Sequence, residues 1–335
     1  MIAIVEPASM ATGPLKEFLP LLRCPETGQP LVLDGQRLVT LSGDREYPVS
    51  PRGIPVFAAR QCSDDARKQQ AHYEKIASAY IENLGYPHTE EYEAALDRAL
   101  LAAIGDVDLG TVAEICCGRG EAFRLLRDRI RQGVGIDISL SMLDAAQQAN
   151  RTGRFAFLQG DATMLPLATG SFDSVFMLGG IHHVNDRRAL FSEIARILKP
   201  GGWFYFREPV SDFAPWRWIR TIIYRLSPTL DHETERPLLW RETVPLLEAS
   251  GLACRHWSTH GFFGFCLFMN SDVLVFNRLF RFLPGIRQLT RLATRIDDAI
   301  LSVPFLRHAG LQVVGAVQRQ QTQAVEPPKM KVDLA

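Results

Sequence analysis

The sequence predicts an α/β protein built on a doubly wound, mainly parallel sheet, with a small β-rich unit before it and helical insertions after it. Between residues 111 and 208, short apolar runs alternate with helical patterns of about 10 to 15 residues, which is typical of βαβ crossovers. A turn of small residues follows the first run, and an acidic residue ends the second. Apolar residues make up 47% of the 335, so the chain can bury a large core.

The first 62 residues form the predicted small unit, because apolar runs at 30–33 and 37–41 are separated by Gly, Pro and Asp turn residues. A helix then begins at the capping residue Ser63 and ends at Gly85. Its apolar side chains, Tyr73 and Tyr80 among them, recur at helical spacing. We expect the main domain to span 63–319.

Within the main domain, strands are expected at 111–117, 133–138, 155–159, 172–179 and 203–209, with helices from about 121, from about 141 and over 187–198. A helix near 243–250 and strands at 252–258 and 311–319 follow. Helical insertions are expected at about 210–240 and 262–309. The polar, proline-containing tail at 320–335 is expected to be disordered.

Composition and charge argue against several classes of protein. Lys plus Arg (37) equals Asp plus Glu (37), so no global positive field attracts nucleic acid. The six cysteines are scattered, which fits a reducing cytoplasm better than a disulfide framework. The N-terminal residues lack the pattern of a secretory signal, and no window offers the roughly 20 apolar residues of a membrane span.

The sharpest motif is the run EICCGRGE at 114–121, which lies between a strand and a helix. Glycines such as Gly118 and Gly120 let the backbone approach a ligand. Asp137 ends the next strand, where an acidic side chain accepts hydrogen bonds from ribose hydroxyls. It lies 19 residues beyond Gly118, near the roughly 20 of dinucleotide sites. The motif therefore predicts a nucleoside-containing ligand.

Two acidic positions favour S-adenosylmethionine over NAD. Glu114 precedes Gly118 by four positions, where its charge suits the positively charged amino-acid portion of that cofactor and would repel a pyrophosphate. Asp161, followed by Ala162 after the third strand, is placed to receive the adenine amino group. An NAD-dependent oxidoreductase remains an alternative, although its GxGxxG pattern is incomplete here.

Together these motifs resemble the class I S-adenosylmethionine-dependent methyltransferases of the small-molecule type, well over 70–208 and more loosely over 240–258 and 311–318. The cofactor loop of the family is matched by EICCGRGE, and its ribose strand and adenine cover by GIDIS, which includes Ile138, together with Met142. The adenine and active-site segment is matched by GDATMLPLATGSFDSVFMLGGIHHV, and the next helix-to-strand turn by LKPGGWFYFREP. The resemblance implies a Rossmann-like methyltransferase fold, S-adenosylmethionine as cofactor, and methylation of an apolar small molecule, with oxygen the preferred atom. Secondary metabolism and lipid, quinone or glycan biosynthesis are the expected settings.

Two features depart from the family pattern. Cys116 stands where the family usually has its first loop glycine, so the turn must accommodate a Cβ atom. Residues 21–57 resemble the zinc-ribbon-like domain found beside some methyltransferases and as an activator of others. Structural zinc needs about four Cys or His ligands, and only Cys24 is left of that pattern. We expect this unit without the metal; a non-catalytic partner module is the second alternative.

His182 and His183 end the fourth strand, at the sheet edge where ligands of α/β proteins bind. A neutral imidazole there can take a proton from a hydroxyl during methyl transfer, and His183 is favoured over His182. Packing is the competing interpretation for both rings. Tyr73 and Tyr80 are expected to pack in the core first and to cover cofactor or substrate second. Glu208 ends the fifth strand, where we expect its carboxylate either to be solvated or to face the substrate.

The segment 273–310 interleaves arginines with Phe, Leu and Ile. This pattern is typical of a lid over an apolar pocket, and also of an amphipathic helix on an anionic membrane surface. We expect a lid from about Phe262 to Leu311, and therefore a large, apolar or lipid-like acceptor. Peripheral contact with a membrane is compatible with the lid.

Overall fold

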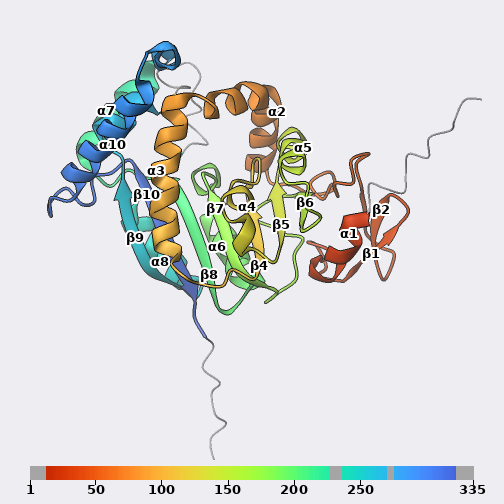
Figure 1. The fold of residues 1–335 in the computed structure, drawn as a ribbon. Coiled ribbons are helices and arrows are strands. Elements are labelled where there is room, and N and C mark those ends of the chain that lie inside the picture. The colour runs from red at the N-terminus through yellow and green to blue at the C-terminus, as the bar shows by residue number, and fades with distance from the viewer. Residues whose placement is uncertain (1–12, 227–235, 270–274, 322–335) are drawn as a thin grey trace, which may run out of the picture.

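The fold is a seven-stranded sheet with a small three-stranded sheet beside it (Figure 1). The structure, a computed structural model, describes residues 13–226, 236–269 and 275–321. The strand order β6-β5-β4-β7-β8-β10-β9 joins β4 (Thr111–Ile115), β5 (Gln132–Asp137), β6 (Phe155–Gln159), β7 (Phe172–Leu178), β8 (Leu198–Pro209), β9 (Leu252–His260) and β10 (Gln312–Arg319). The first five strands in this order are parallel, and β10 is antiparallel to β8 and β9. The predicted doubly wound, mainly parallel sheet is confirmed.

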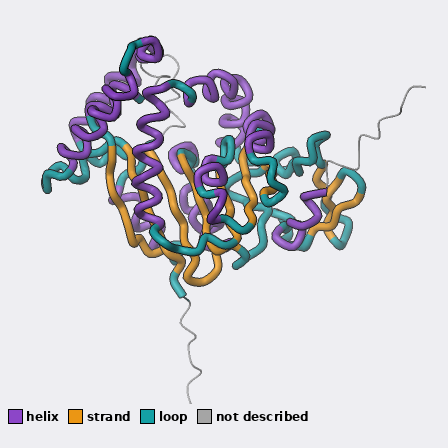
Figure 2. The backbone as a smooth tube through the Cα atoms, viewed as in Figure 1, coloured by secondary structure: helices purple, strands orange, loops and turns teal. Residues whose placement is uncertain are grey.

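Helices cover both faces of the large sheet (Figure 2). Buried side chains from the C-terminal part of α3 (Pro87–Ile104), from α4 (Glu121–Leu125) and from α5 (Leu140–Ala149) share one apolar cluster. Those of α6 (Arg187–Ile197) and α8 (Trp240–Ala249) belong to another. Because both faces are covered, all five residues of β4 are buried.

Helix α3 is the one long element that the sequence analysis did not predict. It begins at a proline, a residue favoured in the first turn of a helix. Its buried residues Leu96, Leu100 and Ile104 recur at a spacing of four, which is helical. This signal was present in the sequence and could have identified the helix.

The N-terminal unit extends the β6 edge of the large sheet. It consists of α1 (Gly13–Phe18), the 3-10 turn η1 (Leu19–Leu21) and an antiparallel sheet of β1 (Leu31–Asp34), β2 (Arg37–Thr40) and β3 (Glu46–Pro48). Phe57 donates its amide hydrogen to the Gln159 carbonyl at 2.9 Å, and the Gln159 amide donates to the Pro55 carbonyl at 2.9 Å. The unit's apolar side chains share a cluster with the sheet, so the unit is packed against the sheet and covers its edge.

A hydrogen-bonded network surrounds Cys24, the residue left from the zinc-ribbon pattern. The buried Cys24 thiol lies 3.1 Å from the hydroxyl of Tyr47, which is also buried. Glu26 accepts hydrogen bonds from Arg45 at 2.8 Å and from Arg60 at 2.6 Å. Within the described ranges, no three His, Cys, Asp or Glu side chains are placed to hold a metal ion. The network joins segments of the unit that lie far apart in the sequence.

We expect the purified protein to contain no stoichiometric zinc, because a single thiolate cannot close a tetrahedral site. Elemental analysis of protein prepared without chelators measures the zinc content, and Cys24→Ser should have the same content as the wild type. One zinc per chain that is lost in Cys24→Ser would contradict this expectation.

Helical segments lie in both predicted insertions. Helix α7 (Ala214–Leu226) follows β8, while α9 (Phe263–Phe268), the 3-10 helix η4 (Val275–Phe282) and α10 (Ile286–Leu301) lie between β9 and β10. These elements and α3 contribute side chains to a third apolar cluster, which includes Tyr92, Trp216 and Phe265. No helix in the described part of the chain has the length and apolarity to cross a membrane. Most of the predicted tail, 322–335, lies outside the described residues.

Candidate active site

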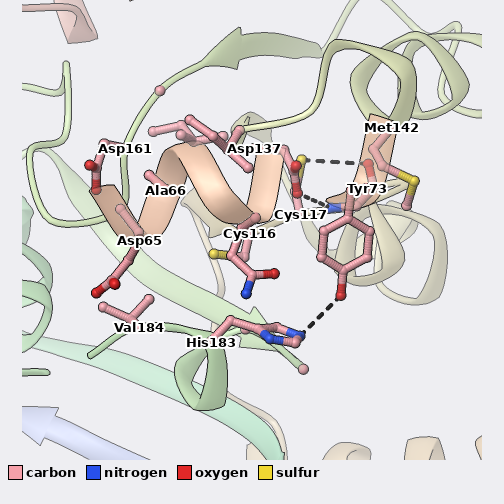
Figure 3. Close-up of a pocket in the computed structure, with 18 of the residues that line it drawn as sticks. Asp65, Ala66, Tyr73, Cys116, Cys117, Asp137, Met142, Asp161, His183 and Val184 are labelled. Carbon is pink, nitrogen blue, oxygen red and sulfur yellow. Dashed lines mark hydrogen bonds between the residues drawn. The ribbon is translucent and has the colours of Figure 1, made fainter. Parts of the chain in front are cut away.

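A pocket lies at the carboxyl ends of β4, β5, β6 and β7, next to helix α2 (Asp64–Leu84). Its lining comes from the turn after β4, the ends of the other three strands, α5 and one face of α2 (Figure 3). The pocket brings together nine residues that the sequence analysis singled out as candidates for contact with cofactor or substrate: Tyr73, Cys116, Gly118, Asp137, Ile138, Met142, Asp161, Ala162 and His183.

Cys116 adopts the backbone conformation of the glycine that it replaces. Its φ of 50° lies in the left-handed region that favours glycine. A Cβ atom built on Gly180 would lie 2.6 Å from the Cys116 Cβ and 3.1 Å from its Sγ, so Gly180 leaves the room that the Cys116 side chain fills. Burial raises the pKa of the Cys116 thiol well above its usual value, which keeps the thiol neutral.

We expect Gly180→Ala to lower the free energy of unfolding by about 1 to 3 kcal/mol, because the added methyl group overpacks against Cys116 and against the flexible end of Met177, whose Cε would lie 2.8 Å from it. Backbone strain does not contribute, since the φ of Gly180 is −123°. In the Cys116→Gly background, Gly180→Ala should lower the free energy of unfolding by much less. Denaturant unfolding of both pairs measures this coupling, and equal costs in the two backgrounds would contradict it.

Asp137 orders the glycine turn from within the pocket. Its two carboxylate oxygens accept hydrogen bonds from the amides of Gly118 and Ser139, each at 2.9 Å. A carboxylate offers about four lone-pair sites, so Asp137 can receive two further donors. Burial raises the pKa of Asp137. Met142 is buried beside the same turn, because its Cε would lie 3.4 Å from a Cβ atom on Gly118.

Asp161 connects the pocket to the start of α2. Its carboxylate accepts hydrogen bonds from the Ser63 amide at 2.8 Å, and from the Thr163 amide and hydroxyl at 2.8 and 2.7 Å. Burial alone would raise the pKa of Asp161, but these hydrogen bonds outweigh burial and hold the pKa below its usual value. Because the Ser63 side chain caps α2, Asp161 anchors the helix that borders the pocket.

Glu114 does not line the pocket. Its buried carboxylate accepts hydrogen bonds from the amides of Ala122 at 2.8 Å and Phe123 at 3.4 Å, at the N-terminus of α4. Burial raises the pKa of Glu114 to about 8. The Glu114 carboxylate thus binds the amides of a helix end, and its contact with a cofactor stays a prediction. Gly120 directly precedes α4 with a φ of 75°, and it also lies outside the pocket lining. The side chain of Tyr80, another predicted contact, is outside the described residues.

His183 borders the pocket opposite helix α2. Its Nε2 lies 3.0 Å from the Tyr73 hydroxyl (Figure 3). Burial, together with the neighbouring His182 and His72, lowers the pKa of His183 well below 6.5, so its ring is neutral at neutral pH. The Nδ1 atom of His183 is buried and has no hydrogen-bond partner among the described residues.

His182, the second predicted catalytic residue, does not line the pocket. Its Nδ1 lies 2.7 Å from the carboxylate of Glu208, which is fully buried and therefore not solvated. Glu208 also accepts hydrogen bonds from the amides of Gly180 at 2.7 Å and Ile181 at 2.8 Å. Glu208 thus fixes the turn that carries His183.

We expect Glu208→Ala to lower the free energy of unfolding by about 3 kcal/mol or more, because two buried amides and a ring nitrogen lose their acceptor at about 1 to 3 kcal/mol each. Glu208→Gln keeps one acceptor oxygen and should lose less. Denaturant unfolding measures both, with the exposed Glu17→Ala as the neutral control. If Glu208→Ala were as stable as the wild type, Glu208 would not be what fixes the turn that carries His183.

Two polar residues of α2, one of which lines the pocket, were missed in the sequence. Glu74 accepts hydrogen bonds from the Ser139 hydroxyl at 3.0 Å and the Ser141 amide at 3.2 Å, which ties α2 to the start of α5. Gln69 lines the pocket, and its Oε1 is buried without a partner in the described structure. The apolar period of 63–85 identified the helix, but no local pattern showed that its polar residues face a pocket.

Helix α2 borders this pocket and includes Tyr73, for which the sequence analysis gave ligand cover as the second interpretation. The lining includes Ser63, Asp65, Ala66, Gln69 and Tyr73, from α2 and its cap. None of the described residues of 210–240 or 262–311 belongs to the lining. The helical insertion is present, and the lid that it was expected to form over an acceptor pocket stays a prediction.

Residues 113–206 match a family model described as a methyltransferase domain. A demethylmenaquinone methyltransferase of Renibacterium salmoninarum is 33% identical over 127 residues, covering 37% of this chain and 52% of that protein. A fatty-acid O-methyltransferase of Mycolicibacterium smegmatis is 29% identical over 119 residues, 34% of this chain and 43% of that protein. The chain thus spans about half the length of the curated relatives it matches. The solved structure of the cyclase SpnF has a TM-score of 0.56 at 20% identity, over 77% of this chain and 97% of that chain, which shows the same fold.

Proposed function

We propose that the protein is an S-adenosylmethionine-dependent methyltransferase that methylates an oxygen of an apolar, lipid-like small molecule. The observation that carries this proposal is the pocket, which gathers the glycine turn, Asp137 and Asp161 at the strand ends of the segment that matches the methyltransferase model. The related sequences that act on a menaquinone precursor and on fatty acids support an apolar acceptor.

The pocket fits this cofactor in three respects. Asp137 retains about two lone-pair sites, which suit the two ribose hydroxyls. Gln69 Oε1 and His183 Nδ1 are buried and unpartnered among the described residues, although both side chains border the pocket. Since buried polar atoms are rarely left unpaired, these two favour a polar ligand at the site. Ile138, Met142 and Ala162 supply apolar cover for an adenine ring.

When bound, the cofactor supplies a methyl group activated by a positively charged sulfur. Asp137 and the turn at 116–120 hold and orient the nucleoside, so that proximity and alignment of the two reactants lower the barrier. His183 is neutral and oriented by Tyr73, and takes the proton that the acceptor hydroxyl loses as its oxygen gains the methyl group. His182 acts indirectly, because it is held on Glu208 away from the lining.

We further propose that residues 1–62 are a zinc-ribbon-like unit that has lost its metal, and that 63–319 form the methyltransferase domain. The three antiparallel strands and the network around Cys24 support this assignment. A cytoplasmic location is proposed from the scattered free cysteines.

Calorimetry with S-adenosylmethionine, S-adenosylhomocysteine and NADH tests the cofactor. We expect both sulfur compounds to bind and NADH to bind far more weakly. Incubation with labelled S-adenosylmethionine and a panel of apolar phenols, demethylmenaquinol and long-chain fatty acids then tests the acceptor by label transfer. Tighter binding of NADH would favour the oxidoreductase, and cofactor binding without transfer to any acceptor would favour the non-catalytic module.

A further inference from the structure

Four neighbouring helical elements expose large apolar side chains to solvent. In the described part of the chain, thirteen of the sixteen exposed large apolar residues lie in or beside these elements: Trp218, Ile219, Ile222, Phe263, Leu267, Phe276, Leu279, Phe282, Leu283, Leu289, Leu292, Ile296 and Phe305. We call this set, carried by α7, α9, η4 and α10, the apolar layer. Such concentration marks an interaction surface, because single exposed apolar residues are normally scattered.

Helix α10 shows that the exposure is organised. Its inward face is formed by Ile286, Thr290 and Thr294, which are buried against the rest of the protein. Leu289, Leu292 and Ile296 recur at helical spacing on the outward face and are 49%, 54% and 50% exposed. The helix therefore exposes an apolar stripe to solvent beside its polar residues, whereas an ordinary surface helix buries its apolar stripe.

The 3-10 helix η4 repeats this arrangement. Phe276, Leu279 and Phe282 are spaced by three residues, which places them on one face of a 3-10 helix. They are 52%, 65% and 68% exposed. Trp218 and Ile222 of α7, spaced by four, are likewise exposed on one face.

Side-chain contacts join these elements into one layer. The Trp216 ring of α7 lies 5.3 Å from Phe263 of α9, and Phe268 of α9 lies 5.6 Å from Phe280 of η4. Asp297 of α10 accepts a hydrogen bond from the Gly264 amide of α9 at 2.9 Å. Helices α7 and α10 accordingly lie together at one corner of the molecule (Figure 1).

The charge of the layer selects its partner. Residues 214–226 and 275–309 contain nine arginines, two aspartates and no lysine or glutamate, a net formal charge of +7. The whole chain has a net charge of zero, so the remainder carries −7. Arg281 pairs with Glu82 of α2, and Arg287 and Arg291 pair with Glu90 and Glu91 of α3, which holds the layer to the main domain. These three carboxylates offset part of the layer's charge, and +7 minus 3 leaves +4. A second copy of the chain, docked layer to layer, would bring like charges together.

We propose that the apolar layer docks on the surface of an anionic lipid bilayer. Exposed Phe, Leu, Ile and Trp side chains enter the boundary of the acyl chains, and the arginines contact the anionic head groups. The role that we assign to this docking rests on the proposed function: the enzyme would meet its lipid-like acceptor at the membrane in which that acceptor dissolves. The docking itself needs neither cofactor nor methyl transfer.

Co-sedimentation with vesicles tests the proposal. The wild type should bind vesicles of phosphatidylcholine that contain about a third phosphatidylglycerol, and it should bind vesicles of pure phosphatidylcholine more weakly. Its affinity for the anionic vesicles should fall as the salt concentration rises. Leu292→Glu with Phe282→Glu should reduce binding at least tenfold, since each change places a carboxylate on the apolar face. Both residues are exposed, so the fold should tolerate the changes. Leu41→Glu, at a 67% exposed leucine of the N-terminal unit, is the matched control and should bind like the wild type.

Absence of vesicle binding at low salt, or equal binding by all variants, would overturn the proposal. So would a wild-type dimer that the layer variants convert to monomers without any vesicle binding, since the layer would then be a contact between copies. Calorimetry with S-adenosylmethionine separates the two proposals: vesicle binding without cofactor binding would reject the proposed function and leave the membrane surface standing.

Discussion

Asp137→Ala should weaken S-adenosylmethionine binding by about 5- to 150-fold, corresponding to roughly 1 to 3 kcal/mol for hydrogen bonds to a charged group. The change removes the acceptor for the ribose hydroxyls. It also frees the amides of Gly118 and Ser139, which Asp137 now fixes at 2.9 Å each, so the glycine turn loses its order. The two effects act in the same direction, and affinity should fall toward the upper end of the range.

Calorimetry at a fixed pH measures the affinity, and circular dichroism shows whether the variant stays folded. Asp137→Asn separates the two effects, because its amide oxygen still accepts one backbone hydrogen bond and keeps the shape of the side chain. We expect it to bind better than Asp137→Ala and worse than the wild type. Asp106→Ala, at an exposed position, is the control. If Asp137→Ala stayed folded and kept the wild-type affinity, the nucleoside would not bind at the end of β5.

The strands and the cofactor turn could be predicted because their signals are local. A buried parallel strand is a short apolar run, and Gly118 with Asp137 sits where two such runs end. The strand ends of a parallel sheet meet at one edge, so Asp161 and His183 were expected in the same place. The structure brings these residues into one pocket.

The helix over 63–85 was predicted, but the contacts that hold it at the pocket were not, because they join residues far apart in the sequence; the amide partners of Glu114 were not predicted either. Helix α2 is held over the pocket by Ser63 with Asp161, 98 residues apart in the sequence, and by Glu74 with Ser139, 65 apart. An acidic residue before a glycine turn can face a ligand or cap the next helix. The short turn and the start of α4 place the Glu114 carboxylate beneath two amides, and this geometry is invisible in the motif.

His183→Ala should reduce turnover of a hydroxyl-bearing acceptor by about 10²- to 10⁴-fold, the range typical of a positioned general base. A carboxylic acid acceptor is already ionised at neutral pH and needs no base, so its turnover should change little. The choice of acceptor therefore reports on the chemistry. His256→Asn is the control, because His256 is an exposed histidine that lies outside the pocket lining.

The pH dependence provides the second readout. The neutral imidazole is the active form, and burial lowers the pKa of His183 well below 6.5. The rate of the wild type should therefore persist as pH falls through 6.5 and decline only at lower pH, where the ring gains its proton. Tyr73→Phe removes the 3.0 Å contact with Nε2 while keeping an aromatic ring, and should lower the rate less than His183→Ala. Label transfer from S-adenosylmethionine measures each rate. If His183→Ala lost turnover equally with the hydroxyl and the carboxylic acid acceptors, and kept the pH profile of the wild type, His183 would be a packing residue and alignment of the reactants would be the source of catalysis.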